Sequence, residues 1–206
     1  MIMKKWLCLL LMVSIIGSLM CGCGAAAETP AEDFSYDMVD GSVVITGYHG
    51  SDREIVIPKE INGRPVVKIG ERAFEEYDLT SIVISENVSM IDRFAFSNCA
   101  CLEKVEFAEG PCLIVEYAFH MCNSLVTIEL PKNSSSIQRS AFSMCDNLEE
   151  IYVPDDYDFT GLGLDYMEKF ISGSDKAVFV ITKNSAMYNA VQEALENGED
   201  IPVKIK

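Results

Sequence analysis

An Ala-Phe pair that returns at an almost constant interval constrains this chain more than any other feature. The four pairs are 22 or 23 residues apart: Ala73-Phe74, Ala95-Phe96, Ala118-Phe119 and Ala141-Phe142. An Ile stands five residues before each Phe, at positions 69, 91, 114 and 137, and a Leu follows each pair, at positions 79, 102, 125 and 148. A fixed period of this length predicts a solenoid, in which each coil buries its apolar side chains against the next coil.

The residues after each Leu predict the walls of that solenoid. Apolar and polar residues alternate there, as in Ile82 and Ile84 or Val105 and Phe107, which is typical of a short strand with one buried face. Stacked coils place such strands in a parallel sheet, about 4.8 Å apart. We expect the Phe of each coil to fill the interior and Ile69 and its equivalents to point inward from the opposite wall. The expected fold class is α/β or mostly β, with about four coils over residues 69–154.

These motifs resemble the BspA-like leucine-rich repeats of bacterial surface proteins. The segments "IVIP", "ING-PV" and "IG-RAF" before the first regular coil fit the pattern of that family, as does the C-terminal stretch from "VFVITKNS" onward. The resemblance covers about residues 36–206. It implies a non-enzymatic protein of the cell surface, associated with adhesion and with host or partner binding. Two departures stand out: Tyr77 replaces the repeat Cys, and residues 155–176 break the period and are expected to form a distorted coil.

Both ends of the array read as caps. Residues 36–68 are expected to form an N-terminal cap and first coil. Asp40-Gly41, beside the strand residues Val43 and Ile45, predicts an entry hairpin in this cap. Residues 155–206 are expected to form an irregular last coil and a helix-strand cap. In that cap Ser185 precedes a helix whose Met187, Val191 and Leu195 share one face, and the helix ends near Gly198. A last strand follows at Ile201, Val203 and Ile205.

The first residues predict export. Lys4 and Lys5 precede an apolar run from Trp6 to Met20, which is shorter than the roughly 20 residues that span a bilayer. Gly22 and Cys23 follow, and this arrangement resembles the lipobox of bacterial lipoproteins. We therefore expect a signal peptide over residues 1–22, lipidation at Cys23 and a tether over residues 23–35. Localisation would be the bacterial cell envelope, on the extracytoplasmic side of a membrane. The alternative is cleavage after Ala27 and secretion as a free protein.

Charge restricts the partners of the mature chain. Residues 1–22 carry two lysines and no acid, so their removal leaves 14 basic and 32 acidic residues. A surface of this sign repels nucleic acid and anionic lipid headgroups. We expect no nucleic-acid partner, membrane association through the lipid alone, and a monomer.

The cysteines and acids suggest sites that have simpler explanations. Cys99, Cys122 and Cys145 occupy equivalent inward positions, where a thiol packs as a small apolar group. Whether these three, Cys101 or Cys112 form disulfides stays open. The segment Asp156-Gly161 matches the first half of a calcium loop, but Met167 stands where the bidentate acid belongs, which favours an acidic turn. No cofactor is expected.

No constellation predicts catalysis. The chain has two histidines, His49 and His120, and no Ser in a G-x-S-x-G context. His120 replaces a Ser of the neighbouring coils, so we expect it on an exposed turn.

The outward strand positions are the candidate binding face. They comprise Ser81, Val83, Lys104, Glu106, Thr127, Glu129, Glu150 and Tyr152. Inward neighbours are committed to the core, so only these positions can vary freely. Stacking would align Val83, Glu106, Glu129 and Tyr152 in one column, with two carboxylates in the middle and an aromatic anchor at one end. We predict a protein or glycan partner here; a structural or accessory envelope scaffold is the alternative function, ahead of an enzyme.

Overall fold

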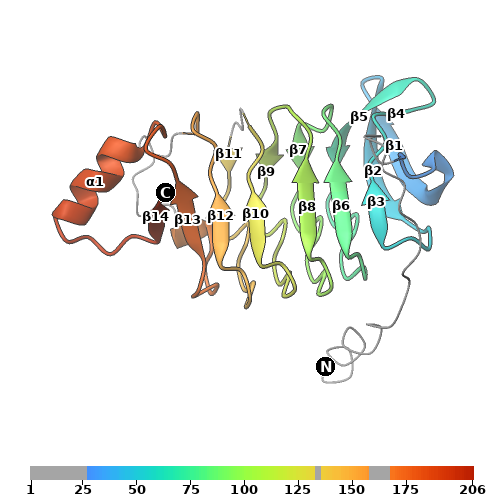
Figure 1. Cartoon of the computed structure of the whole chain (residues 1–206). Helices are drawn as coiled ribbons and strands as arrows, with labels where there is room; N and C mark the ends of the chain where they lie inside the picture. The colour runs from blue at the N-terminus through green and yellow to red at the C-terminus, as the bar shows by residue number, and fades with distance from the viewer. Residues whose placement is uncertain (1–26, 133–135, 158–167) are drawn as a thin grey trace, which may run out of the picture.

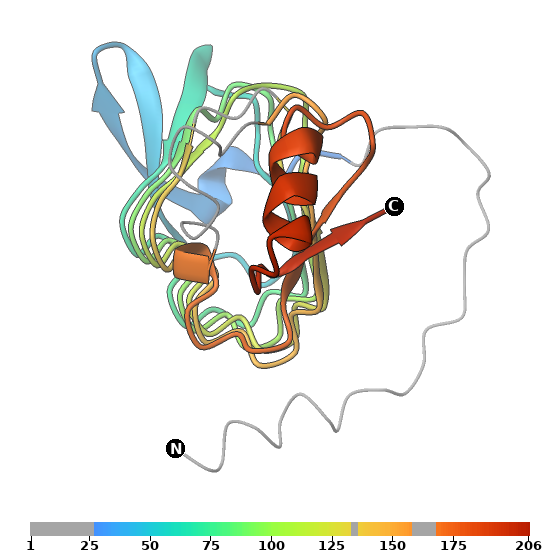
Figure 2. The same ribbon diagram turned by 90° about the vertical axis from the view of Figure 1, so that its left-hand side faces the viewer.

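A computed structural model describes residues 27–132, 136–157 and 168–206. The chain winds into a stack of coils whose strands lie side by side, with the N-terminal coils at the right and the C-terminal coils at the left of Figure 1. Seen along the stack, the coils superpose into one closed outline, and α1 (Tyr188–Glu196) covers the C-terminal end (Figure 2). The solenoid and its parallel sheets are confirmed.

Two walls of the solenoid are β-sheets. The front strands in the view of Figure 1 are β3 (Glu54–Val56), β6 (Ser81–Ile84), β8 (Lys104–Phe107), β10 (Thr127–Glu129), β12 (Glu150–Tyr152) and β13 (Val178–Ile181). The back strands are β5 (Arg64–Ile69), β7 (Met90–Ile91), β9 (Leu113–Ile114) and β11 (Ser136–Ile137). The described part of the front wall therefore holds six coil strands rather than the four coils predicted, because the flanking segments 36–68 and 155–206 also contribute coils.

The Ala-Phe pairs line up along a third side of the coils, here called the Ala-Phe corner. Its packing explains why the Ala-Phe pair recurs in the sequence. Phe74, Phe96, Phe119 and Phe142 are fully buried, and successive rings stack with centroids 5.1 to 5.3 Å apart. Backbone bonds tie the coils together at the same place: the amide of Phe96 donates to the carbonyl of Ala118 at 2.8 Å, and Phe119 donates to Ala141 at 2.8 Å. The repeat is thus a packing requirement of neighbouring coils.

The cysteine column packs against this corner as predicted. The Cys99 thiol donates to the Phe74 carbonyl at 3.0 Å, Cys122 to Phe96 at 3.3 Å and Cys145 to Phe119 at 3.1 Å. Burial raises the pKa of the Cys99 thiol to about 12, so the thiol is neutral at physiological pH. The three cysteines and Cys112 are free thiols.

The irregular segment 155–176 continues the stack where it is described. Phe170 is fully buried and its carbonyl accepts from the amide of Phe142 at 2.9 Å. The Ser174 hydroxyl donates to the Phe142 carbonyl at 2.7 Å, the contact that a Cys makes in the earlier coils. The repeat pattern does not reveal this equivalence, because the spacing from Phe170 to Ser174 is one residue longer than the spacing from Phe to Cys in the earlier coils.

The N-terminal cap begins earlier than predicted. β1 (Phe34–Val39) pairs antiparallel with β2 (Ser42–Tyr48) through the Asp40-Gly41 turn, which confirms the hairpin. Residues 29–35, however, belong to the cap and not to a tether, since the Thr29 amide bonds to the Val56 carbonyl at 3.0 Å and Phe34 is buried. A short 3-10 turn, η2 (Ala31–Asp33), leads into β1. β4 (Glu60–Ile61) and β5 form a second hairpin beside it.

The C-terminal cap differs from the predicted helix face in one residue, Leu195. α1 buries Val191 and Ala194, and Met187 is buried just before it, while Leu195 is 40% exposed. Leu195 was therefore assigned to the wrong face. The Ser185 hydroxyl accepts from the Met187 amide at 3.2 Å, and Gly198 ends the helix with a left-handed φ of 78°. β14 (Val203–Ile205) then pairs parallel with β13.

Candidate binding face

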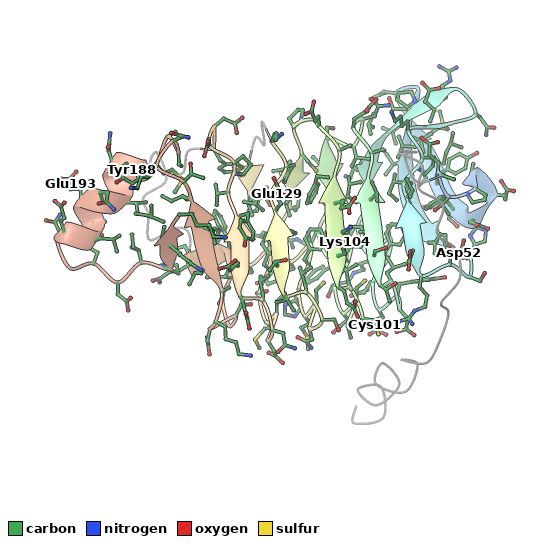
Figure 3. All side chains as sticks on the ribbon, viewed as in Figure 1. Asp52, Cys101, Lys104, Glu129, Tyr188 and Glu193 are labelled. Carbon is green, nitrogen blue, oxygen red and sulfur yellow. The ribbon has the colours of Figure 1, made fainter. Side chains whose placement is uncertain are left out.

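The outward positions of the front strands pair in register as the sequence predicts, except between β8 and β10, which belong to different sheets. Val83 pairs in register with Glu106, and Glu129 pairs with Tyr152. In the second column Ser81 pairs with Lys104, and Thr127 with Glu150. Lys104 on β8 and Glu129 on β10 are labelled on this face in Figure 3. The inward neighbours Ile82, Val105, Ile128 and Ile151 are buried, so the alternation is confirmed.

The front wall is interrupted at its middle. β3, β6 and β8 form one sheet, and β10, β12, β13 and β14 form another. Within the described residues, no backbone hydrogen bond joins β8 to β10. The back wall has no such interruption, since β5, β7, β9 and β11 belong to one sheet over the same coils. Here we call the gap between β8 and β10 the seam.

A groove of about 250 Å³ lies at the seam. Its lining comes from both strands and from the turns that follow them: Val105, Glu106, Phe107, Ala108, Glu109, Glu129, Leu130, Pro131 and Lys132. Glu106 and Glu129, which the sequence analysis placed next to one another, both line it. Phe107, Pro131 and Lys132 were not predicted as site residues, because the repeat pattern classed them as core or turn.

The carboxylates of the face differ in their partners. Glu106 forms an ion pair with Lys104 of the same strand. Glu129 is exposed, and no described side chain lies within ion-pair or hydrogen-bond distance of its carboxylate. The middle of the face thus presents one carboxylate in an exposed, weak ion pair and one with no described charged partner.

The aromatic end of the face is covered by the protein itself. The Lys206 ammonium lies 4.4 Å from the centroid of the Tyr152 ring and donates to the Tyr152 hydroxyl at 2.9 Å. Lys204 forms a 2.6 Å ion pair with Glu150, which also accepts from the Tyr152 hydroxyl. The prediction that Tyr152 offers a free aromatic anchor is therefore wrong, because the strand after α1 carries two lysines back to this column.

These contacts shift the protonation of Glu150. The hydrogen bond from Lys204, followed by the one from Tyr152, lowers the pKa of the Glu150 carboxyl to about 2. Glu150 is consequently ionised at all physiological pH values and holds both lysines in place.

A partly exposed row of residues, here called the ridge, runs along the Ala-Phe corner. The residue before each Ala adopts a left-handed φ, at Arg72, Phe94, Tyr117 and Ser140. This conformation costs about 1–2 kcal/mol for a residue with a Cβ. The Phe94 and Tyr117 rings stack 5.2 Å apart, and the Arg72 guanidinium lies 4.6 Å from the Phe94 ring, which offsets part of that cost.

His120 lies on a turn, as predicted, but its side chain is half-buried. Its Nδ1 is 2.9 Å from the Ser143 hydroxyl and its ring meets Tyr117 edge to face. The turns of adjacent coils are therefore close enough for their polar side chains to bond.

No described group of three or more His, Cys, Asp or Glu side chains is arranged to hold a metal. Most of the Asp156-Gly161 segment, and the Met167 position, lie outside the described residues. Cys23 and the apolar run before it lie outside them too. No helix within residues 27–132, 136–157 and 168–206 has the length and apolar character needed to cross a bilayer.

The family profile of the BspA type leucine-rich repeat region (6 copies) matches residues 53–164. The chain belongs to the BspA-type leucine-rich repeat family. The match begins at β3, so the repeats start before the predicted boundary at residue 69 and include a coil that we had assigned to the cap.

Solved structures agree with membership of the BspA-type family. A T. pallidum leucine-rich repeat protein (TpLRR) shares 27% identity over 75% of this chain and 72% of its own, with a TM-score of 0.63. A leucine-rich repeat protein from Bacteroides capillosus shares 25% identity over 61% of this chain and 97% of its own, with a TM-score of 0.55. The pneumococcal vaccine antigen PcpA, at 15% identity over 85% of this chain and 48% of its own, has a TM-score of 0.55 and shows the fold alone. A search of the curated proteins finds no match. BspA-type repeats are generally non-catalytic, and they offer a repeat-based binding surface.

Proposed function

We propose that this BspA-type protein is a non-enzymatic recognition protein of the bacterial cell surface, which binds a protein or glycan partner through its front wall. The observation that carries the proposal is the difference between the inward and the outward side chains of the front strands. Inward side chains are buried in the stack, whereas the outward residues Lys104, Glu106, Thr127 and Glu129 are exposed, and Glu106 and Glu129 line a groove at the seam. Selection on binding can therefore act on the outward columns without loss of the fold.

The proposal includes attachment by lipid at Cys23. Its support is the apolar run followed by Gly22 and Cys23 in the sequence. Diacylglycerol with an amide-linked chain would anchor the protein stably, because stable anchoring needs two or more acyl chains. Labelling of cells with a fatty-acid analogue tests this step: the wild-type protein should carry label, and Cys23→Ala should not. Label that persists on Cys23→Ala overturns lipidation at this residue, and free release of the wild-type protein into the medium favours secretion.

The binding face is tested by capture of partners on the mature protein. Wild type and a Glu106→Lys, Glu129→Lys variant are used to capture material from envelope extracts and from arrays of host-matrix proteins and glycans. We expect the variant, at an unchanged melting temperature, to lose the partner that wild type captures. Unchanged capture over a range of salt concentrations excludes this face. Capture of envelope components alone, with no host-matrix ligand, would instead favour the scaffold function.

A further inference from the structure

The seam leaves backbone groups of two strands without sheet partners. In a parallel strand, successive residues direct their peptide groups to opposite neighbours. The amides of Lys104 and Ala108 bond toward β6, to the carbonyls of Thr80 and Ile84, so Val105 and Phe107 direct theirs toward β10. On the other side, Leu130 bonds to Tyr152 of β12, so Glu129 directs its peptide group toward β8.

The groove above these groups combines an apolar base with an acidic rim. Leu130 and Pro131 are buried and Phe107 is half-buried, whereas Glu106, Glu109 and Glu129 are exposed. Lys132 is 3.9 Å from Glu109, a weak contact at the end of the groove. A group that fills it must present hydrogen-bond donors and positive charge on a body that tolerates apolar contact.

The protein shows on the same face how such a group is bound. Lys206 places its ammonium on an aromatic ring, Tyr152, and Lys204 pairs with the adjacent carboxylate of Glu150. At the seam, Glu129 supplies an exposed carboxylate that no described lysine or arginine reaches, and the half-buried Phe107, which packs against the core, lines the groove beside it. The formal net charge of −16 adds a long-range attraction for a basic segment.

From these observations we propose that the seam groove binds an arginine side chain from an extended, basic segment of a partner protein. The guanidinium would pair with the carboxylates of Glu106 and Glu129, while the aliphatic part of the side chain lies against the apolar lining of the groove. Arginine suits the groove better than lysine, because its five donors in a fixed plane can serve two carboxylates and the unpaired carbonyls of the seam together. This inference rests on the proposed function and names the chemistry of the partner.

The test uses three peptides of equal length in a Ser-Gly background, carrying two arginines, two lysines or two citrullines. Each is titrated into the mature protein, and binding is followed by the backbone amide signals of Val105, Phe107, Thr127 and Glu129. We expect the arginine peptide to shift these four signals, with weaker binding at high salt. The citrulline peptide has the same shape without the charge and should cause no shift.

Two variants and a matched control locate the site. Glu129→Gln and Glu106→Gln should each weaken binding of the arginine peptide by about two- to five-fold, the loss expected for one exposed charge pair. Glu54→Gln removes an exposed carboxylate of β3 on the same wall and should change nothing. Absence of binding, equal binding of the citrulline peptide, or insensitivity to both groove variants overturns the inference. Equal binding of the lysine peptide overturns the assignment to a guanidinium.

The same variants separate this inference from the proposed function. If Glu129→Gln still captures the native partner while the Glu106→Lys, Glu129→Lys variant does not, the front wall binds but the groove does not take a basic side chain. If neither variant affects capture, the proposed function fails as well.

Discussion

The back wall and the front wall of this solenoid are made by the same coils, yet only the back wall is continuous. Back strands such as β7 and β9 have two residues each and still pair without a break from β5 to β11. Front strands have three or four residues and separate at the seam between β8 and β10. Length of strand therefore does not decide continuity.

Charge on the outward positions offers a physical reason for the difference. On the back wall the outward residues of β7 and β9 are Met90 and Leu113, which are uncharged neighbours in register. On the front wall Glu106 and Glu129 bring two carboxylates to either side of the seam, and like charges on adjacent strands oppose close pairing. Repetition of the inward residues stacks the coils, and the outward residues decide where the sheet stays open.

The strongest test of this comparison acts on the corner that both walls share. Phe119→Ala should lower the free energy of unfolding by about 3–5 kcal/mol, because it leaves a cavity between the Phe96 and Phe142 rings. Val126→Ala, at a residue that is 45% exposed, is the control and should change stability by less than about 0.5 kcal/mol. Urea denaturation measures both. Equal midpoints would show that the stack does not depend on the aromatic column.

Hydrogen exchange should separate the two walls directly. The amides of Val105 and Phe107, directed into the seam, should exchange at least about 100-fold faster than those of Phe96 and Phe119, which donate across the corner at 2.8 Å. NMR or mass spectrometry on the mature protein gives these rates. Comparable protection at all four amides would mean that β8 and β10 pair in solution.

Closing the seam should stabilise the protein slightly. Glu129→Thr removes one of the two facing carboxylates and introduces a residue that favours strands, so we expect a gain of about 0.5 kcal/mol and slower exchange at Phe107. The matched change Glu54→Thr, on a front strand away from the seam, should leave exchange at Phe107 unaltered. A loss of stability in Glu129→Thr would show that charge does not keep the seam open.

Acid should loosen the covered end of the front wall. The pKa of Glu150 is about 2 in the folded protein and 4.5 for a free carboxyl, so its ion pairs stabilise the fold above pH 4.5 and are lost as pH falls toward 2. Proteolysis of the C-terminal strand, or the signals of Lys204 and Lys206, should report release over that range. Glu150→Gln should show the released state at neutral pH. Identical behaviour of wild type and variant at pH 7 would contradict the role of this carboxyl.

The sequence by itself determined the repeating unit, and it determined which residues of each strand face the core and which face outward. Phe and Cys recur at one interval, as at Phe119 and Cys122, because each must pack against its equivalent in the next coil. That requirement involves only neighbouring coils. For the same reason the register of Val83 with Glu106, and of Glu129 with Tyr152, could be predicted from the period alone.

Only the tertiary structure decided what happens on the outward face. Lys206 reaches Tyr152 although the two residues are 54 positions apart, and no period links them. The seam is equally invisible in the repeat, since β8 and β10 follow the same pattern as strands that do pair. Both features depend on how charged side chains meet in space after the coils have stacked, and the inward pattern that dictates the stacking does not specify those contacts.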